Sequence, residues 1–141
     1  MGSIVKWVNC GAVGRPEQGY PGDAGYDLYV MTGVEINAGE TVDVKHGLAI
    51  ELPERTWAMI VGRSSTMRNR GLLVNMAIID NGYRGMLFTS VTNINKGVVK
   101  VGRGERISQL ILMPLVEMKF VQTTELGRSE RGDAGFGSSG R

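Results

Sequence analysis

The chain holds little that suits metal or thiol chemistry. Of its 141 residues, one is a cysteine and one is a histidine. Cys10 has no partner within the chain for a disulfide, and a zinc site built from cysteine and histidine ligands is excluded. A Ser-His or Cys-His nucleophile pair would need His46, which we expect to lie at the surface or in a local hydrogen bond.

Long apolar runs and a large net charge are also absent. No apolar stretch approaches the ~18 residues that a membrane-spanning helix needs, and the first residues have no signal-peptide pattern. The net charge of +2 is too small to favour nucleic acid or a membrane surface as a partner. We therefore expect a cytoplasmic protein that binds neither membranes nor nucleic acid directly.

Glycine, in contrast, is abundant. The chain has 21 glycines, roughly twice the usual share, and they separate short stretches of β-forming residues. Only residues 66–70 favour a helix, with Ser64 or Ser65 as its cap and Gly71 as its end. This pattern predicts an all-β fold, a distorted antiparallel jelly-roll barrel with one short helix. The expected strands are residues 4–8, 26–30, 34–36, 40–44, 48–52, 56–61, 72–79, 86–91, 98–101 and 106–112.

The C-terminal residues differ from the rest. From residue 126 on, no periodic apolar pattern continues, and residues 132–141 contain four glycines. By composition this is a flexible tail. It carries a single aromatic residue, Phe136, and a nearby cation, Arg131, which could stack on and pair with a ligand. We therefore divide the chain into a barrel, residues 1–125, and a lid, residues 126–141.

Asp80 is the first candidate for chemistry. It ends an apolar run and precedes Asn81-Gly82, a strong turn dipeptide, and a second apolar run follows. Apolar runs on both sides of such a turn predict a β-hairpin. A carboxylate at this place could accept a proton from water or bind a metal, or it could simply cap the turn.

Arg63-Ser64-Ser65 is the second candidate. A strand that delivers a cation, two hydroxyls and the free amides of a helix start could bind an anion, or it could be an ordinary helix cap. Arg106 and Gln109 lie in an otherwise apolar strand, so each needs a polar partner in the protein or in a ligand.

Five segments together resemble the motifs of the homotrimeric dUTP pyrophosphatases (dUTPases). They appear in that family's order and span most of the chain, and five in order are far more specific than any one of them. The segments are DAGYDL at 23–28, GRSS at 62–65, IIDNGYRG at 78–85, GERISQ at 104–109 and RGDAGFGSSG at 131–140.

The resemblance implies a reaction and a catalytic residue. The family hydrolyses dUTP to dUMP and pyrophosphate with Mg²⁺, which keeps uracil out of DNA and supplies dUMP for dTMP synthesis. Asp80 matches the carboxylate that orients and deprotonates the water attacking the α-phosphorus. Tyr83 matches the ring that packs under the sugar and excludes a ribose 2′-hydroxyl. Asp27 matches the acid that holds the Mg²⁺ shell through water.

The resemblance also implies the substrate contacts and a shared site. In a homotrimer, the residues that bind the phosphates, the catalytic Asp80 and the tail would come from three different subunits. The uracil contacts correspond to the backbone of Val74, Asn75, Met76 and Ala77, and Ile79 is a further substrate contact. The phosphate contacts correspond to Arg63, Ser64, Ser65 and Gln109, and the lid contacts to Arg131, Phe136, Gly137 and Ser138.

Three departures and two alternatives accompany this interpretation. Gly62 replaces a usual proline, Gly82 a usual acid, and Ala77 a usual glycine at the uracil-reading segment.

A dCTP deaminase shares the barrel but needs a glutamate where Ser90 stands. A nucleotide-binding regulatory module with a protein partner would bind dUTP without turnover, and it would not need the acid or the lid.

Overall fold

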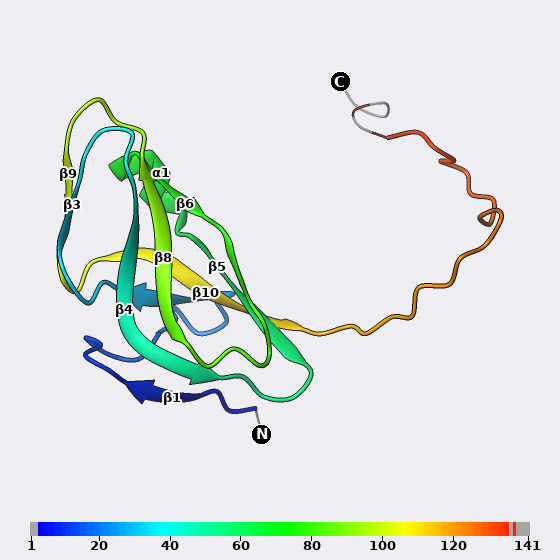
Figure 1. Ribbon diagram of the computed structural model, residues 1–141, viewed down its shortest axis with the longest axis horizontal. Coiled ribbons are helices and arrows are strands. Elements are labelled where there is room, and N and C mark those ends of the chain that lie inside the picture. The colour runs from blue at the N-terminus through cyan, green and yellow to red at the C-terminus, as the bar shows by residue number, and fades with distance from the viewer. Residues whose placement is uncertain (1–2, 136, 138–141) are drawn as a thin grey trace.

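The computed structural model describes residues 3–135 and 137, and it confirms an all-β, antiparallel fold with one short helix (Figure 1). The elements of this part of the chain are β1 (Lys6–Asn9), β2 (Gly25–Tyr29), β3 (Val34–Ile36), β4 (Thr41–Glu51), β5 (Thr56–Gly62), α1 (Ser64–Arg70), β6 (Leu72–Asn75), β7 (Ala77–Ile79), β8 (Met86–Asn93), β9 (Val99–Val101) and β10 (Arg106–Pro114).

Two four-stranded sheets form the barrel. One has the strand order β1-β4-β8-β6 and the other β2-β10-β5-β7, and a small β3-β9 ribbon lies beside them. Residues alternate between core and surface along the strands. In β8, for example, Leu87 and Val91 are buried between more exposed neighbours. The core consists of two apolar clusters, one centred on Leu28 and Ile60 and one on Val30 and Ile107.

The expected strands 40–44 and 48–52 are a single strand, β4, so their separation was wrong. Gly47 has φ 75°, and the pairing of β4 with β8 shifts between Lys45 and Ala49. The glycine therefore marks an irregularity within one long strand, which bends without ending.

The predicted hairpin around Asn81-Gly82 was half right. The amide of Tyr83 donates to the carbonyl of Asp80 at 3.0 Å, so the turn is there. However, β7 pairs with β5, while β8 pairs with β6. The chain crosses from one sheet to the other after Asn75, so the apolar runs on the two sides of the turn pack in different sheets.

The helix begins two residues earlier than expected. Ser64 and Ser65 lie inside α1, and Arg63 is the N-cap residue without a side-chain capping bond, so the prediction of a serine cap was wrong. Gly71 ends the helix in the left-handed conformation, with φ 60°, as predicted. None of the described helices is long and apolar enough to cross a membrane.

His46 is fully buried, so the expected surface position was wrong, and the alternative of a local hydrogen bond was wrong as well, because its hydrogen-bond partners are distant along the chain. Its Nδ1 lies 2.9 Å from the carbonyl of Tyr29 and its Nε2 lies 2.6 Å from the hydroxyl of Thr89, which in turn lies 2.7 Å from the hydroxyl of Ser108. Burial lowers the pKa of His46 below its ordinary value of 6.5, although the bond to Tyr29 acts in the opposite direction. The histidine on β4 therefore joins β2, β8 and β10 inside the barrel through hydrogen bonds.

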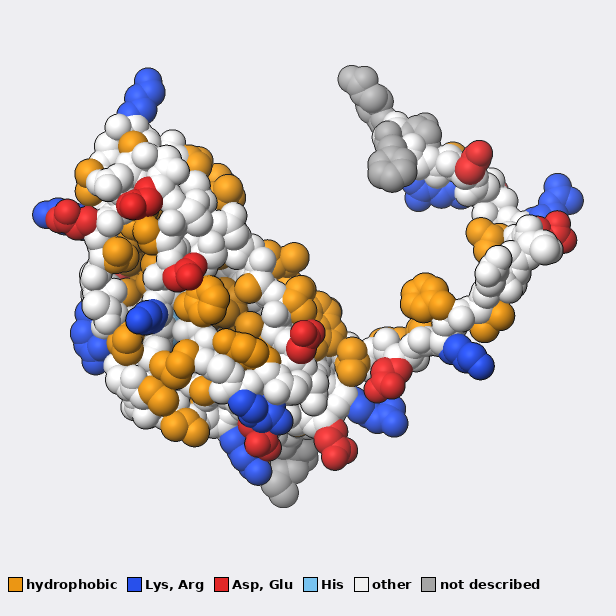
Figure 2. Space-filling view, viewed as in Figure 1, with side chains coloured by type: hydrophobic (Ala, Val, Ile, Leu, Met, Phe, Trp, Pro, Cys, Tyr) orange, Lys and Arg blue, Asp and Glu red, His pale blue; other side chains and the backbone are white. Residues whose placement is uncertain are grey.

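After β10 the chain leaves the barrel as an extended segment (Figure 1). Its apolar side chains are largely in solvent, and Figure 2 shows them spaced along the segment. Phe120 is 98% exposed and Leu126 is 89% exposed. These side chains pack against no part of their own barrel, and such exposure is unusual for large apolar groups.

Candidate active site

Asp80 lies in a cavity of about 200 Å³ at the turn between β7 and β8. The carboxylate is exposed, because β7 ends one residue before it. Apolar side chains surround it, so the cavity could accept a flat apolar group beside an acid. The lining residues are Ala77, Ile78, Ile79, Asp80, Tyr83, Met86, Leu87 and Phe88.

The ring of Tyr83 is fixed in this cavity by two contacts. Its hydroxyl donates to the carbonyl of Met86 at 3.0 Å. The ring also passes directly over Gly85, where an added Cβ would lie 2.4 Å from the hydroxyl oxygen and 2.5 Å from Cζ. Gly85 is therefore required to be small, because any side chain there would displace the ring.

Arg63 lines a separate polar cleft of about 360 Å³ between α1 and the start of β10. Three arginines face this cleft. Arg70 is neutralised by an ion pair with Glu105 and also donates to the carbonyl of Lys100. The lining residues are Arg63, Ser65, Thr66, Asn69, Arg70, Gly104, Glu105, Arg106 and Ile107.

Asp27 anchors the other two arginines. Nε of Arg63 lies 3.0 Å from one of its carboxylate oxygens, and a terminal nitrogen of Arg106 lies 3.4 Å from the other. Arg63 donates in addition to the carbonyl of Arg106 at 3.1 Å. Two cations thus share one nearly buried anion, which leaves the group with a net positive charge, suited to an anionic ligand.

Gln109 has the partner that its position in an apolar strand demands. Its side-chain amide donates to the carbonyl of Gly62 at 3.0 Å. The residue is half-buried and does not line the cleft itself, but Gly62, its partner, immediately precedes Arg63. In the same way, Arg106, which the sequence marks only as needing a partner, proves to belong to the cleft.

The two cavities lie at opposite ends of β5. Ala58 pairs with Ile79, so Asp80 continues the register opposite Trp57, at the start of β5, whereas Arg63 follows its end. The six residues from Trp57 to Arg63 correspond to about 20 Å at ~3.3 Å per residue. One chain therefore does not bring Asp80 and Arg63 together around one phosphate group.

Of the expected uracil contacts, Ala77 shares the cavity with Asp80, as does the expected substrate contact Ile79, whereas Val74, Asn75 and Met76 do not line it. The side-chain amide of Asn75 donates instead to the hydroxyls of Ser90, at 3.1 Å, and Thr92, at 3.2 Å. Sequence reasoning missed Met86 and Phe88, which line the cavity. Their alternation along the strand after the turn was the available signal, because it puts both on one face.

Of the expected lid residues, Arg131 and Gly137 lie in the described part of the extended segment. Arg131 donates from Nε to the carbonyl of Ala134, a local contact within that segment, and Gly137 is exposed. Phe136 and Ser138 lie outside the described residues.

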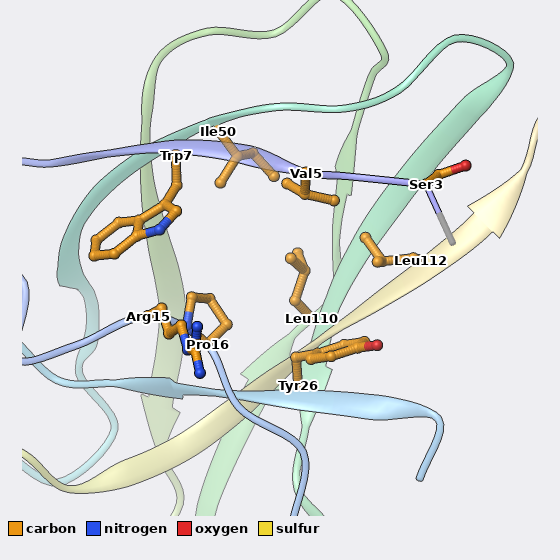
Figure 3. Close-up of a pocket in the computed structure, with 9 residues that line it drawn as sticks. All are labelled: Ser3, Val5, Trp7, Arg15, Pro16, Tyr26, Ile50, Leu110 and Leu112. Carbon is orange, nitrogen blue, oxygen red and sulfur yellow. The ribbon is translucent and has the colours of Figure 1, made fainter. Parts of the chain in front are cut away.

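A third cavity, of about 280 Å³, contains none of the predicted site residues. Figure 3 shows Trp7 and Val5 on one side of it and Tyr26, Leu110 and Leu112 on the other. Its lining is mostly apolar, and the single cation at its rim is Arg15.

An acid in one cavity, a cationic cleft in another and an antiparallel barrel are features of a protein that handles a phosphorylated ligand. Comparison with known proteins makes this specific. The family model described as dUTPase matches residues 13–140. This chain belongs to the dUTPase family.

Individual relatives agree with this result. The deoxyuridine 5′-triphosphate nucleotidohydrolase of Clostridioides difficile is 39% identical over 138 residues, which cover 96% of each chain. The Pol polyprotein of Ovine maedi visna related virus is 42% identical over 118 residues, or 84% of this chain, and this chain spans 11% of that polyprotein. The structure of the Staphylococcus bacteriophage 80alpha dUTPase with dUpNHpp matches with a TM-score of 0.93 at 26% identity, covering 99% of this chain and 100% of that one.

Proposed function

We propose that this dUTPase hydrolyses dUTP to dUMP and pyrophosphate by Mg²⁺-assisted attack of water on the α-phosphorus. The observation that carries the proposal is the pairing of a carboxylate cavity with a cationic cleft on one barrel, which matches the demands of the reaction. Phosphoryl transfer needs alignment and charge neutralisation more than covalent help from the protein.

Asp80 is the proposed general base. It holds the attacking water and accepts its proton, while the apolar wall formed by Ile79 and Phe88 keeps other water away. Tyr83 lies on the same cavity, and its fixed ring supports the sugar and leaves no room for a 2′-hydroxyl. The uracil then lies against the chain at Ala77, whose methyl group narrows the place where the base would enter.

The cleft is the proposed phosphate site. Arg63, Ser64 and Ser65 contact the phosphates, and of these Arg63 and Ser65 line the cleft. Gln109 supports them from β10 through its bond to Gly62. Because Asp27 and the carbonyl of Arg106 hold the guanidinium of Arg63, its orientation is set before substrate arrives. Preorganised charge of this kind lowers the cost of stabilising the developing phosphate charge.

Mg²⁺ fits this site as an ion carried by the substrate. No group of three or more His, Cys, Asp and Glu side chains that could cage a metal occurs among residues 3–135 and 137. Both carboxylate oxygens of Asp27 face arginine nitrogens, which leaves a water-mediated contact as its role toward the ion. When bound, Mg²⁺ supplies charge neutralisation on the phosphates, as expected for an ion that keeps most of its water.

We further propose a homotrimer in which three chains build each site. Two observations support an assembly: Asp80 and Arg63 lie about 20 Å apart on one chain by strand geometry, and the extended segment after β10 exposes large apolar side chains. β10 ends at Pro114, opposite Thr56, so the segment leaves at the Asp80 end of β5 and continues away from its own barrel. Arg131, Phe136, Gly137 and Ser138 would then close over the site of a neighbour, and residues 126–141 would act as the lid.

Pyrophosphate release from dUTP, dCTP, dTTP and UTP by the wild-type protein and by Asp80→Asn tests the proposal. We expect release from dUTP alone and a loss of at least about 100-fold in the variant. Release from dCTP or dTTP at a similar rate would contradict uracil recognition at Ala77. No release from any of the four, with retained nucleotide binding, would favour the regulatory module. The related phage dUTPases, among them that of Staphylococcus bacteriophage 80alpha, control the transfer of virulence genes.

A further inference from the structure

Gln109 lies in a space that exists because residue 25 has no side chain. An added Cβ on Gly25 would lie 1.8 Å from Oε1 of Gln109, 2.6 Å from its Cδ and 3.1 Å from its Cγ. The φ angle of Gly25 is not in the left-handed region, so its backbone conformation does not require glycine. The space that it leaves is therefore the physical reason for glycine at this position.

Strand register explains why these two residues meet. Gln109 on β10 pairs with Asp27 on β2, and Gly25 lies two residues before Asp27 on the same face. On its other side β10 pairs with β5, where the neighbour of Gln109 is Val61 and the next residue is Gly62. The side-chain amide of Gln109 therefore lies between the two neighbouring strands. Its Oε1 lies beside Gly25 of β2, and its Nε2 donates to the backbone carbonyl of Gly62 of β5.

This arrangement fixes a flexible side chain in one rotamer. A glutamine has three rotatable bonds and loses much conformational freedom when it is ordered. Here the slot at Gly25 and the 3.0 Å bond to Gly62 hold both ends of its amide. The bond ends on the residue directly before Arg63, so the same contact also fixes the strand end that presents this arginine to the cleft.

We propose that Gly25 is a positioning residue of the phosphate site, acting through Gln109 on Gly62 and Arg63. The inference deepens the proposed function and rests on the roles given there to Gln109 and Arg63. A methyl group at residue 25 pushes the amide of Gln109 out of its slot, breaks the bond to Gly62 and loosens Arg63. Phosphate binding then weakens, although no residue that contacts the substrate has changed.

A double-mutant cycle tests this with Gly25→Ala, Gln109→Ala and the combination of both. Gly97→Ala is the matched control, because an added Cβ there meets no atom within 4 Å and its φ is also outside the left-handed region. Calorimetry measures the affinity for dUpNHpp and for dUMP, which lacks the two terminal phosphates. We expect Gly25→Ala to weaken the binding of dUpNHpp about fivefold or more, as for the loss of the neutral hydrogen bond between Gln109 and the carbonyl of Gly62, with the binding of dUMP nearly unchanged. Gly97→Ala should match the wild type.

The combined variant gives the decisive comparison. Once residue 109 is alanine, the slot is empty, so Gly25→Ala should cause no further loss. If Gly25→Ala alone fails to fold, the combined variant should recover the fold. Equal losses from Gly25→Ala in both backgrounds, equal losses for dUMP and dUpNHpp, or no loss at all would overturn the proposal.

A spectroscopic measurement keeps this result separate from the proposed reaction. The side-chain NH₂ resonances of Gln109 report its bond to Gly62 whether or not dUTP is hydrolysed. They should shift in Gly25→Ala and stay in place in Gly97→Ala. Failure of the wild-type protein to release pyrophosphate would count against the hydrolase proposal. Unchanged Gln109 resonances in Gly25→Ala would count against the positioning role of Gly25.

Discussion

Adding one methyl group at Gly85 should damage the sugar side of the site. The ideal Cβ of an alanine would lie 2.4 Å from the hydroxyl oxygen of Tyr83, and ordinary contacts begin near 3.4 Å, so the ring must move by about 1 Å. Such a movement breaks the 3.0 Å bond to the carbonyl of Met86. One neutral hydrogen bond is worth about 1 kcal/mol, or fivefold, and a 1 Å error in positioning costs up to about 100-fold.

We therefore expect Gly85→Ala to lower kcat/KM for dUTP by about 5-fold to 100-fold. Discrimination against UTP should fall as well, because the displaced ring no longer blocks a 2′-hydroxyl. Steady-state pyrophosphate release with dUTP and UTP measures both quantities. The control is Gly82→Ala in the same turn, where an added Cβ meets no atom within 4 Å. Unchanged kinetics in Gly85→Ala, or an equal loss in Gly82→Ala, would refute the reasoning.

Three further predictions concern the interior and the tail. Thr89→Val removes bonds of 2.6 Å to His46 and 2.7 Å to Ser108, so thermal melting should show a loss of about 2–3 kcal/mol, or roughly 6–12 °C; a shift below about 2 °C would contradict the network. Because the folded-state pKa of His46 lies below 6.5, the unfolded chain binds the extra proton first. Stability should thus be complete above about pH 6.5 and fall below it by at most ~1.4 kcal/mol per pH unit, a dependence that His46→Gln should remove in pH-dependent melts. Deleting residues 132–141 should lower turnover more than tenfold while the melting temperature stays within about 2 °C, and unchanged turnover would exclude a lid.

The sequence predicts most of the strands because apolar alternation and glycine act locally. It fails to predict which strand β8 pairs with, because both β6 and β7 precede the turn and only β6 is its neighbour. The runs on either side of Asn81-Gly82 both read as strands of a hairpin, yet β7 pairs with β5 and β8 with β6. A turn dipeptide determines where the chain reverses, whereas the sheet that each arm joins depends on packing between residues far apart in the sequence.

The same distinction applies to the candidate site. Asp80 and Arg63 stand out by residue type and neighbours, and Tyr83 only by the family resemblance, but the separation of Asp80 and Arg63 along β5 becomes visible only from strand register. The ion pair of Asp27 with Arg63 and the hydrogen-bond partners of His46 were equally beyond the sequence, because each joins strands that are distant along the chain. The burial of His46 did have a local signal, because the alternation of Val42 and Val44 continues to residue 46 and puts it on their face of the strand.

The length of β5 has a genetic consequence. In the proposed trimer, a working site takes Asp80 from one chain and Arg63 from another, so two inactive variants can repair each other. A chain with Asp80→Asn still offers its arginine, and a chain with Arg63→Ala still offers its acid. Random mixing of the two would leave roughly a quarter of the sites with both wild-type groups, so two null alleles in one cell would complement, and a strictly monomeric enzyme could not behave in this way.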